Sequence, residues 1–251
     1  MRVAVIRHHE EDSAGFLAEA FEARGATLSV HLFPKPDPLP PLDGLDHVIV
    51  LGAINSVYDD GEHREWIDAE LDWLRAADAA GVPVLGVCFG AQALSAAFGG
   101  HVEAAEHKEI GWTMVDTVDP GLIPAGPWLE FHGDRSLPPP HARILARNKV
   151  GVQAFALGRH LAVQFHPEVD GAQLGLWLDA GGRTEALKEG HDPDALLAET
   201  FAQEAASRER ADTLVAAAVL IADTGRESES RRRRPGGAGW LSSLRSLRPS
   251  G

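Results

Sequence analysis

The 251-residue sequence contains a single cysteine, Cys88, and lacks any long apolar run. A lone cysteine excludes a disulfide framework within the chain and is typical of a reducing compartment, so we expect a cytoplasmic protein. No apolar run approaches the ~20 residues that a membrane-spanning helix needs. The N-terminal stretch 1–6 is too short an apolar run for a signal peptide and instead predicts a first strand. We therefore expect no membrane span.

Positive charge is also scarce, because 23 Lys and Arg residues stand against 37 Asp and Glu residues and leave a net charge of −14. Residues 226–251 carry a local charge of +5, so residues 1–225 carry −19. Such an acidic body disfavours nucleic-acid phosphates and anionic membranes as partners. The composition of 226–251 predicts a disordered basic tail. This tail is either idle or, through a basic amphipathic patch at 240–248, an anchor for a partner or a membrane surface.

Signals for cofactors are missing as well. The sequence contains no Gly-x-x-x-x-Gly-Lys-Ser/Thr phosphate loop, and no histidine has a second ligand at a convincing metal-binding spacing. We therefore expect neither a metal nor an organic cofactor. No internal repeat is evident, and the length suits one sizeable core with a small appendage.

Strand and helix patterns alternate through the first hundred residues. The expected strands are 2–6, 27–32, 47–51 and 82–87, and the expected helices are 13–24, 62–80 and 92–98. This alternation predicts an α/β fold with a mostly parallel central sheet flanked by helices. From residue 100 the pattern changes to short strands, at 112–115, 143–146, 152–155 and 161–164. These strands predict an antiparallel region at the edge of the parallel sheet.

The last part of the chain has helical spacing. We expect one helix at 172–178 and one or two more at 193–222, of which 203–212 is polar enough to be a solvated surface helix. The chain is thus divided into a domain at 1–190, a helical extension at 191–225 and the tail at 226–251.

Cys88 stands where the apolar run 82–87 ends and a helix begins. Gly86 and Gly90 flank it, and a sharp turn needs glycine there because the backbone crowds itself. This is the pattern of a nucleophile elbow, with cysteine in place of serine. At a helix N-terminus, backbone N–H groups and the helix dipole favour a thiolate. The alternative is a buried cysteine with a purely structural role.

His166 and Glu168 follow the apolar strand 161–165, where open α/β sheets place their active sites. Residues separated by two lie on one side of an extended segment, so the two side chains can meet. A cysteine nucleophile needs a base and a group that fixes the tautomer of that base. His166 and Glu168 can supply both. The alternative is a surface histidine beside a capping glutamate.

Gly52 and Ala53 form a turn directly after the strand 47–51. Such a turn can aim a backbone N–H at a neighbouring elbow and contribute to an oxyanion hole. The alternative is an ordinary turn between a strand and a helix.

Together these residues resemble the class I (triad) glutamine amidotransferases. The matching stretches are Gly86-Val-Cys-Phe-Gly-Ala-Gln92, Gln164-Phe-His-Pro-Glu168 and Gly52-Ala-Ile-Asn-Ser-Val57. Two further stretches, Glu109-Ile-Gly-Trp112 and Phe131-His-Gly-Asp134, resemble the amidotransferase domain of GMP synthases more than the other branches. The resemblance covers roughly residues 1–178. Ala53 stands where the family usually has a second glycine, and Phe131 where related domains often have tryptophan.

The resemblance implies a flavodoxin-like fold and hydrolysis of the glutamine side-chain amide without a cofactor. It makes Cys88 the nucleophile, His166 the base and Glu168 the residue that orients the base. The oxyanion hole would then consist of backbone N–H groups of Phe89 and of Ala53 or Gly52.

The resemblance also points to residues that would bind the substrate. The resemblance gives Gln92 and the Gly52 turn a role in positioning glutamine, and we add His132 and Asp134 as candidate substrate-binding residues. His8 and His9, like His132, either line the cleft or lie at the surface.

The acceptor of the ammonia remains open. In GMP synthases an ATP-pyrophosphatase module uses the ammonia, and nothing in this sequence resembles that module. Three hypotheses follow: a glutaminase subunit that delivers ammonia to a separate synthase or acceptor enzyme, a stand-alone hydrolase of γ-glutamyl amides or peptides, and a non-catalytic regulatory or binding member of the fold. The intact Cys-His-Glu set argues against the third.

Overall fold

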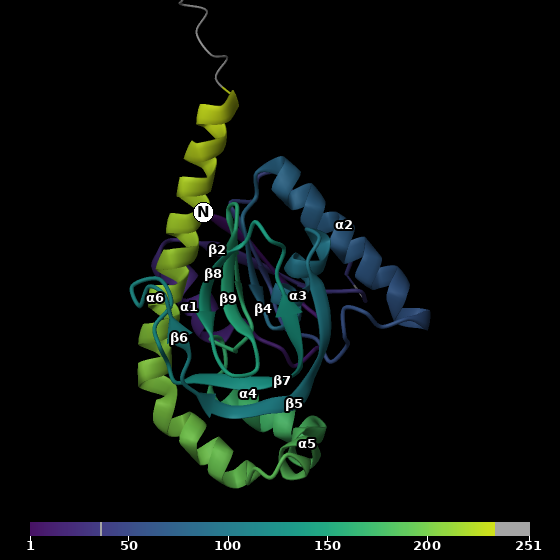
Figure 1. Ribbon diagram of the computed structural model, residues 1–251, viewed down its shortest axis with the longest axis vertical. Helices are drawn as coiled ribbons and strands as arrows, with labels where there is room; N and C mark the ends of the chain where they lie inside the picture. Colours follow the sequence, from purple (N-terminus) through teal and green to yellow (C-terminus); the bar gives the residue numbers. More distant parts are fainter. Residues whose placement is uncertain (36, 234–251) are drawn as a thin grey trace, which may run out of the picture.

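Short apolar runs form the central sheet in the computed structural model, which describes residues 1–35 and 37–233. Eight strands lie in the order β2-β1-β3-β4-β10-β9-β8-β6 (Figure 1). The pairs from β2 to β10 are parallel, and those from β10 to β6 are antiparallel. The predicted mostly parallel sheet with an antiparallel edge is confirmed. The strand bounds are β1 Arg2–Arg7, β2 Thr27–Leu32, β3 His47–Val50, β4 Val84–Val87, β6 Asp116–Thr117, β8 Arg143–Arg147, β9 Val152–Leu157 and β10 His160–Val163.

Strand β4 lies between β3 and β10, and all three run in the same direction. Their carboxyl ends therefore meet at one edge of the sheet. Gly52, Cys88 and His166 each follow the end of one of these strands. The sheet topology thus brings together three segments that are far apart in the sequence.

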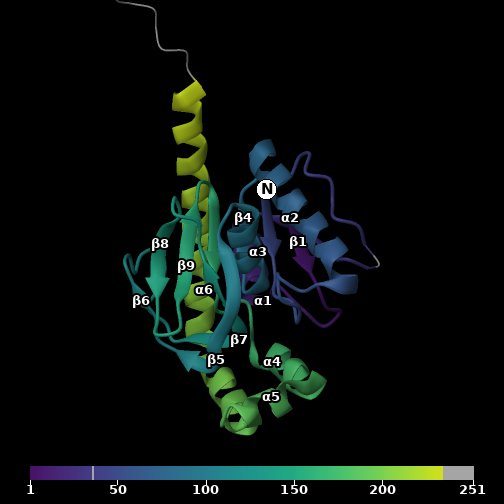
Figure 2. The same ribbon diagram turned by 45° about the vertical axis from the view of Figure 1, so that its right-hand side comes forward.

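Helices cover both faces of the sheet (Figure 1), and Figure 2 shows α4 and α5 below it. Helices α1 and α6 cover one face, where Phe16 and Leu214 belong to the same buried cluster. Helices α2 and α3 cover the other face, where Ile67 and Leu94 are buried. The helix bounds are α1 Gly15–Ala23, η1 Gly61–His63, α2 Arg64–Ala80, α3 Phe89–Ala97, α4 Gly171–Trp177, η2 Leu178–Gly182, α5 Arg183–Lys188 and α6 Pro193–Arg233.

Two long strands, β5 His101–Thr113 and β7 Trp128–Leu137, form a separate two-stranded ribbon. We expected only a short strand at 112–115, at the edge of the central sheet. The expectation was wrong because residues 103–108 have no apolar face and are mostly exposed, so they give no strand signal. The ribbon pairs around an irregularity between Ala104 and Glu109. An isolated bridge between Leu129 and His166 ties the ribbon to the segment after β10.

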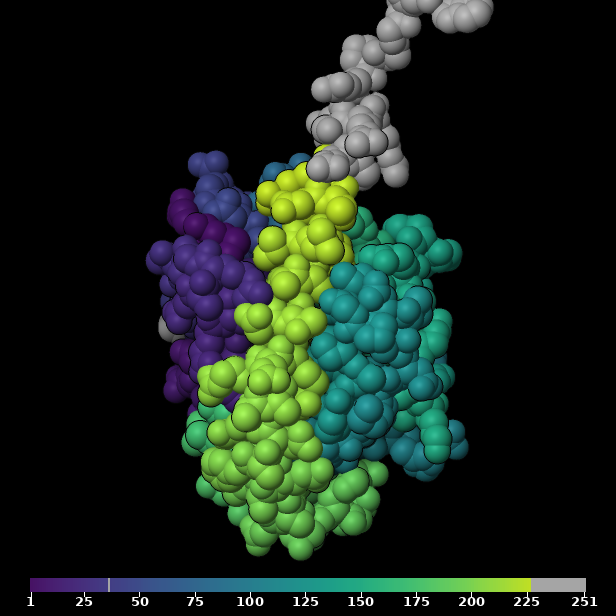
Figure 3. Space-filling model, turned by 90° about the vertical axis from the view of Figure 1, so that its left-hand side faces the viewer, coloured from purple at the N-terminus to yellow at the C-terminus, as the bar shows by residue number. Residues whose placement is uncertain are grey.

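Helix α6 is a single helix of 41 residues that runs along one side of the molecule (Figure 3). Its residues 203–206 are exposed or half-buried, whereas Ala211, Leu214 and Ile221 are part of the core. The expected extension 191–225 therefore shares the core of the first 190 residues.

The same helix also continues past position 226, where we expected the tail to begin. Arginine and glutamate are good helix formers, and Arg226 donates to the carbonyl oxygen of Asp46 at 3.3 Å. Residues 234–251 of the expected tail lie outside the described part of the chain. Among the helices of the described residues, none is long and apolar enough to cross a membrane.

Candidate active site

Cys88 adopts a backbone conformation that L-residues rarely use, with φ 52° and ψ −106°. Within residues 1–35 and 37–233 it is the only non-glycine residue with positive φ. Its N–H donates to the carbonyl oxygen of Val163 at 2.9 Å. Helix α3 begins at Phe89, directly after the cysteine and three residues before the expected start at Gln92. This strained turn has the conformation expected of an elbow.

The two glycines around Cys88 are required by close packing. A Cβ atom at Gly86 would lie 2.5 Å from the carbonyl oxygen of Gly90. A Cβ atom at Gly90 would overlap the carbonyl oxygen of Val50 in strand β3. The turn therefore leaves no room for a side chain at either position.

His166 and Glu168 form a buried pair beside the elbow. His166 Nδ1 lies 2.8 Å from Glu168 Oε1, and the side chains are 4% and 2% exposed. The backbone N–H of His166 donates to the carbonyl oxygen of Leu129 at 2.8 Å. The Trp177 ring meets the imidazole edge-on, with centroids 4.8 Å apart. Backbone, carboxylate and indole together fix the orientation of the imidazole.

The outer nitrogen of His166 stays available. Burial lowers the pKa of His166, but the charges of Glu168 and Cys88 outweigh it and raise the pKa well above the ordinary value. Among the described residues, no partner meets hydrogen-bond geometry at Nε2, and Cys88 is the group that acts on His166 besides Glu168. A buried imidazole with one bonded and one open nitrogen can carry a proton to and from a neighbouring group.

The Gly52 turn lies against both of these residues. A Cβ atom at Gly52 would sit 3.3 Å from His166 Cε1 and 3.9 Å from Cys88 Sγ. The turn can therefore approach the site closely because position 52 is a glycine. Phe89 is the first residue of α3, so its N–H is one of those that the helix leaves unpaired. Ala53 lines the same cleft as Cys88.

The cleft has a volume of about 910 Å³. Its floor includes Cys88, Gln92 and His166, and its walls come from the Gly52 turn, the irregular part of β5 and the α4–η2–α5 segment. Lys108 in β5 forms an ion pair with Glu185 in α5, which joins two of these walls.

The three candidate substrate-binding residues all line this cleft. Gln92 is buried and donates to Gln164 Oε1 at 3.3 Å. Asp134 accepts from the Ser56 hydroxyl at 2.5 Å and from the Tyr58 hydroxyl at 2.7 Å. Asp134 therefore holds the loop after β3 against strand β7.

His132 belongs to a charged cluster with Glu109 and Glu130. Its Nε2 lies 3.0 Å from Glu130 Oε2 and 3.2 Å from Glu109 Oε2, and its Nδ1 lies 2.8 Å from the carbonyl oxygen of Asp134. Burial lowers the pKa of His132, but the hydrogen bonds to Glu109 and Glu130 outweigh this effect and raise the pKa to about 10.

One nitrogen or oxygen atom from each of these three side chains lies within 4.8 Å of the others. Among the described residues, this is the group whose spacing could hold a metal ion. A protonated His132 that donates from both nitrogens already pairs with the two carboxylates. The cluster is therefore a charge-paired network in this state.

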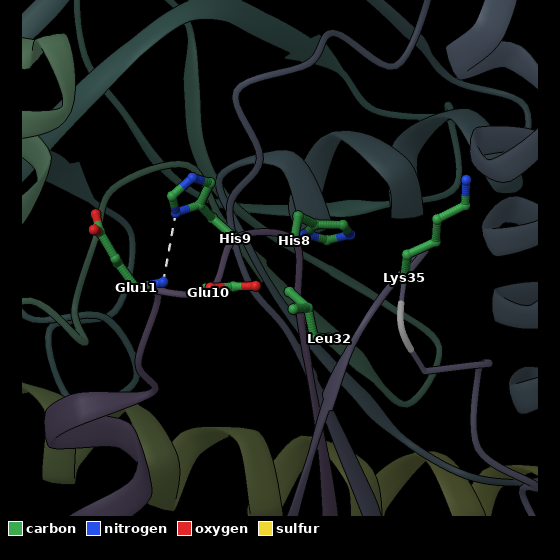
Figure 4. Close-up of a pocket in the computed structure, with 6 residues that line it drawn as sticks. All are labelled: His8, His9, Glu10, Glu11, Leu32 and Lys35. Atoms are coloured by element: carbon green, nitrogen blue, oxygen red, sulfur yellow. Dashed lines mark hydrogen bonds between the residues drawn. The ribbon is translucent and has the colours of Figure 1, made fainter.

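Sequence reasoning left open where His8 and His9 lie and did not single out Glu70 or Trp177. The His8 side chain is buried behind the Gly52 turn and bonds to Glu70, 62 positions away. His8 and His9 line a second pocket of about 290 Å³, and His9 also lines the main cleft (Figure 4). No local pattern could have found these partners, because they meet only in the folded chain.

Comparison with known proteins agrees with this geometry. Residues 14–176 match the class-I glutamine amidotransferase family, and the chain belongs to this family. It is similar to the GMP synthase (glutamine-hydrolyzing) of Nitrobacter hamburgensis, with 38% identity over 38% of this chain and 21% of that protein. The GMP synthase of Aeropyrum pernix is 34% identical over 55% of this chain and 28% of that protein. The matches thus span only about a quarter of the length of these relatives.

Solved structures with the same fold cover more of the chain. A glutamine amidotransferase from Thermotoga maritima has a TM-score of 0.79 and 26% identity, over 87% of this chain and 98% of that chain. A glutamine amidotransferase from Methylobacillus flagellatus has a TM-score of 0.76 over 88% of this chain and 94% of that chain. At 24% identity, the second likeness supports the fold alone.

Proposed function

We propose that this chain is a glutaminase subunit that hydrolyses the side-chain amide of glutamine through Cys88, His166 and Glu168. The observation that carries the proposal is the arrangement of these residues. The strained elbow of Cys88 and the open nitrogen side of the His166–Glu168 pair face the same glycine turn. This combination matches the requirements of thiol-based amide hydrolysis.

In the first half of the reaction, the Cys88 thiolate attacks the carboxamide carbon of glutamine. The carbonyl oxygen becomes an oxyanion, which the N–H groups of Phe89 and Ala53 or Gly52 stabilise. His166 then donates its Nε2 proton to the leaving nitrogen. Ammonia departs, and a γ-glutamyl thioester remains on Cys88.

In the second half, water attacks the thioester carbon while His166 Nε2 accepts a proton from it. The C–S bond breaks, glutamate leaves and the thiolate is restored. Glu168 holds the Nδ1–H throughout and stabilises the cationic form of His166. The raised pKa of His166 supports an imidazolium that can give its Nε2 proton to the leaving nitrogen. None of these steps requires a cofactor.

We further propose that the ammonia passes to a separate acceptor enzyme. The GMP synthases that resemble this chain are matched over only 21% to 28% of their length. The family match at residues 14–176 includes Cys88 and His166, so we assign the use of the ammonia to an acceptor enzyme outside the matched residues.

The size of the cleft favours a second candidate function, hydrolysis of γ-glutamyl amides or peptides without a partner. A volume of about 910 Å³ is near the upper end for sites that enclose drug-sized ligands, and much larger than glutamine requires. The same thioester chemistry would then release an amine or a peptide instead of ammonia.

Glutamate release from L-glutamine and from a γ-glutamyl dipeptide tests both functions, with a Cys88→Ala variant as the control. Turnover of glutamine that depends on Cys88 supports the glutaminase. Faster Cys88-dependent turnover of the dipeptide supports the second function. If Cys88 reacts with neither substrate nor with a glutamine-like electrophile, the chain is a non-catalytic member of the fold.

A further inference from the structure

A buried histidine holds the Gly52 carbonyl from behind the cleft. His8 Nδ1 lies 2.8 Å from the Gly52 oxygen, and His8 Nε2 lies 2.9 Å from Glu70 Oε2. The two side chains are 4% and 1% exposed. A carbonyl oxygen can only accept, so Nδ1 carries a proton and donates it. His8 therefore fixes one side of the Gly52–Ala53 peptide unit.

The orientation of that peptide determines where its N–H points. The bond is trans, and in a trans peptide the N–H points opposite to the C=O. Since the Gly52 oxygen is turned to His8, the Ala53 N–H is turned away from it. Ala53 and Cys88 line the same cleft, and a Cβ atom at Gly52 would lie 3.9 Å from Cys88 Sγ.

We propose that His8 and Glu70 are a positioning pair that makes the Ala53 N–H an oxyanion donor for the reaction at Cys88. The inference rests on the proposed function and deepens it. Neither residue lines the cleft that contains Cys88. They act through the Gly52–Ala53 peptide, whose two possible orientations would respectively present a donor or an acceptor to the oxyanion.

Glu70 has no other hydrogen-bonding role among the described residues. One carboxylate oxygen bonds to His8, and the other, Oε1, has no partner there. Burying a carboxylate costs free energy unless the carboxylate is paired and hydrogen-bonded, and His8 is the partner of Glu70. Burial lowers the pKa of His8, but the charge and hydrogen bond of Glu70 outweigh it, and the pKa is raised. A donor on the Gly52 carbonyl polarises the amide and strengthens its N–H as a donor.

Phe89, whose backbone N–H is the other candidate oxyanion donor, packs its ring against the same histidine. The Phe89 ring meets His8 edge-on with centroids 4.9 Å apart, and Trp66 lies 5.6 Å from His8 and 5.7 Å from Phe89. These rings hold the imidazole in place. His8 thus packs between the segments that provide both candidate N–H groups.

The test compares variants of His8 in the full chain. His8→Leu removes the donor, whereas His8→Asn places an amide N–H near the position of Nδ1. We expect His8→Leu to lower kcat for glutamine about 100-fold, as loss of one oxyanion donor does, with KM changed by less than about threefold. His8→Asn should recover most of the lost rate, and Glu70→Gln should fall between wild type and His8→Leu.

Two probes separate positioning from general damage. Glutamate γ-semialdehyde adds to Cys88 to give a tetrahedral oxyanion, so its affinity should fall about 100-fold in His8→Leu. Iodoacetamide alkylates the thiolate by direct displacement without an oxyanion, and its rate should stay within about twofold. Equal semialdehyde affinity in wild type and His8→Leu overturns the inference. A parallel fall in alkylation overturns it as well, since the damage is then structural.

His160 provides a matched control at the opposite end of the sheet. It is also a buried histidine with a carboxylate, 3.1 Å from Asp78, and a backbone contact, 3.1 Å from the Val84 N–H. His160→Leu should lower thermal stability and leave kcat and semialdehyde affinity unchanged. If it lowers both as much as His8→Leu does, the effect is not one of positioning.

The probes also separate this inference from the proposed function. If wild type releases no glutamate but binds the semialdehyde, and His8→Leu loses that binding, the inference stands and the hydrolytic function fails. If wild type takes up neither compound, both fail. If wild type turns glutamine over and His8→Leu does so equally fast, only the inference fails.

Discussion

Two buried histidines face the cleft, and each lies two residues from a carboxylate that it contacts. His166 bonds to Glu168 through Nδ1, and among the described residues no partner meets hydrogen-bond geometry at its Nε2. His132 bonds to the Asp134 carbonyl through Nδ1 and to Glu130 through Nε2. The same residue types at the same separation therefore end in different bonding states.

The difference is the one expected between a histidine that transfers protons, as we propose for His166, and one whose protons are held in place. Proton transfer needs a nitrogen that can gain and lose its proton, and His166 keeps one. Both nitrogens of His132 are occupied, so its proton is held. Leaving a buried polar atom unsatisfied costs free energy, and a fold keeps such an atom where a reacting group will use it.

The largest effect should come from His166→Ala, with His132→Ala as the comparison. We expect His166→Ala to lower kcat for glutamine about 10⁴-fold, because the proton carrier is lost. His132→Ala should lower it less than about tenfold, because its protons are not transferred. Glutamate release from folded protein measures both. Equal losses would remove the distinction between the two histidines.

A smaller effect should come from the partner of the reactive histidine. Glu168→Gln keeps the size of the side chain and removes its charge, so kcat should fall about 10³-fold, less than for His166→Ala. The pKa of His166, followed by NMR, should fall in the same variant, since Glu168 raises it in wild type. A larger loss for Glu168→Gln than for His166→Ala would contradict the assigned roles.

Replacing His132 should lower the stability of the folded protein. His132→Leu leaves Glu109 and Glu130 buried without their cation, and should reduce the free energy of unfolding by about 3 kcal/mol. His132→Gln retains hydrogen-bond donors and should cost less. Urea unfolding monitored by tryptophan fluorescence checks both. An unchanged midpoint in His132→Leu would mean that the cluster does not depend on its charge.

The smallest effect concerns pH. The pKa of His132 is about 10 in the folded protein, above the ordinary value of 6.5. A raised pKa gives stability that is complete below the unfolded value and is lost as pH rises toward the folded value, by on the order of 1 kcal/mol per pH unit. Between pH 7 and 8, wild type should therefore lose more stability than His132→Gln. Parallel unfolding curves for the two proteins would refute this assignment.

Sequence patterns were sufficient for the parts of the fold that repeat simple periods. The four apolar runs before Cys88 gave the parallel strands, and the glycines around it indicated the sharp turn. The patterns missed the β5–β7 ribbon, because residues 103–108 lack an apolar face. They also missed the full extent of α6, which runs to Arg233, because the composition from residue 226 onward indicated a disordered tail.

The candidate site also has one part that sequence patterns predict and one part that they do not. Cys88, His166 and Glu168 stand next to strand ends, so local patterns identify them as candidates. The contacts of His8 with Glu70 and of Trp177 with His166 join distant segments. Only tertiary packing creates these contacts, so the spacing of residues in the sequence cannot predict them.

The hydrogen bond from Cys88 to Val163 has a consequence for the time course of synthesis. Strand β4 is made early, but its neighbour β10 follows some seventy residues later, and chains emerge from the ribosome N-terminus first. Until β10 docks, Cys88 lacks the backbone partner that holds its strained turn. The same docking event then delivers His166 and Glu168. A nascent chain therefore lacks the arrangement of Cys88, His166 and Glu168, which forms in one step when β10 docks.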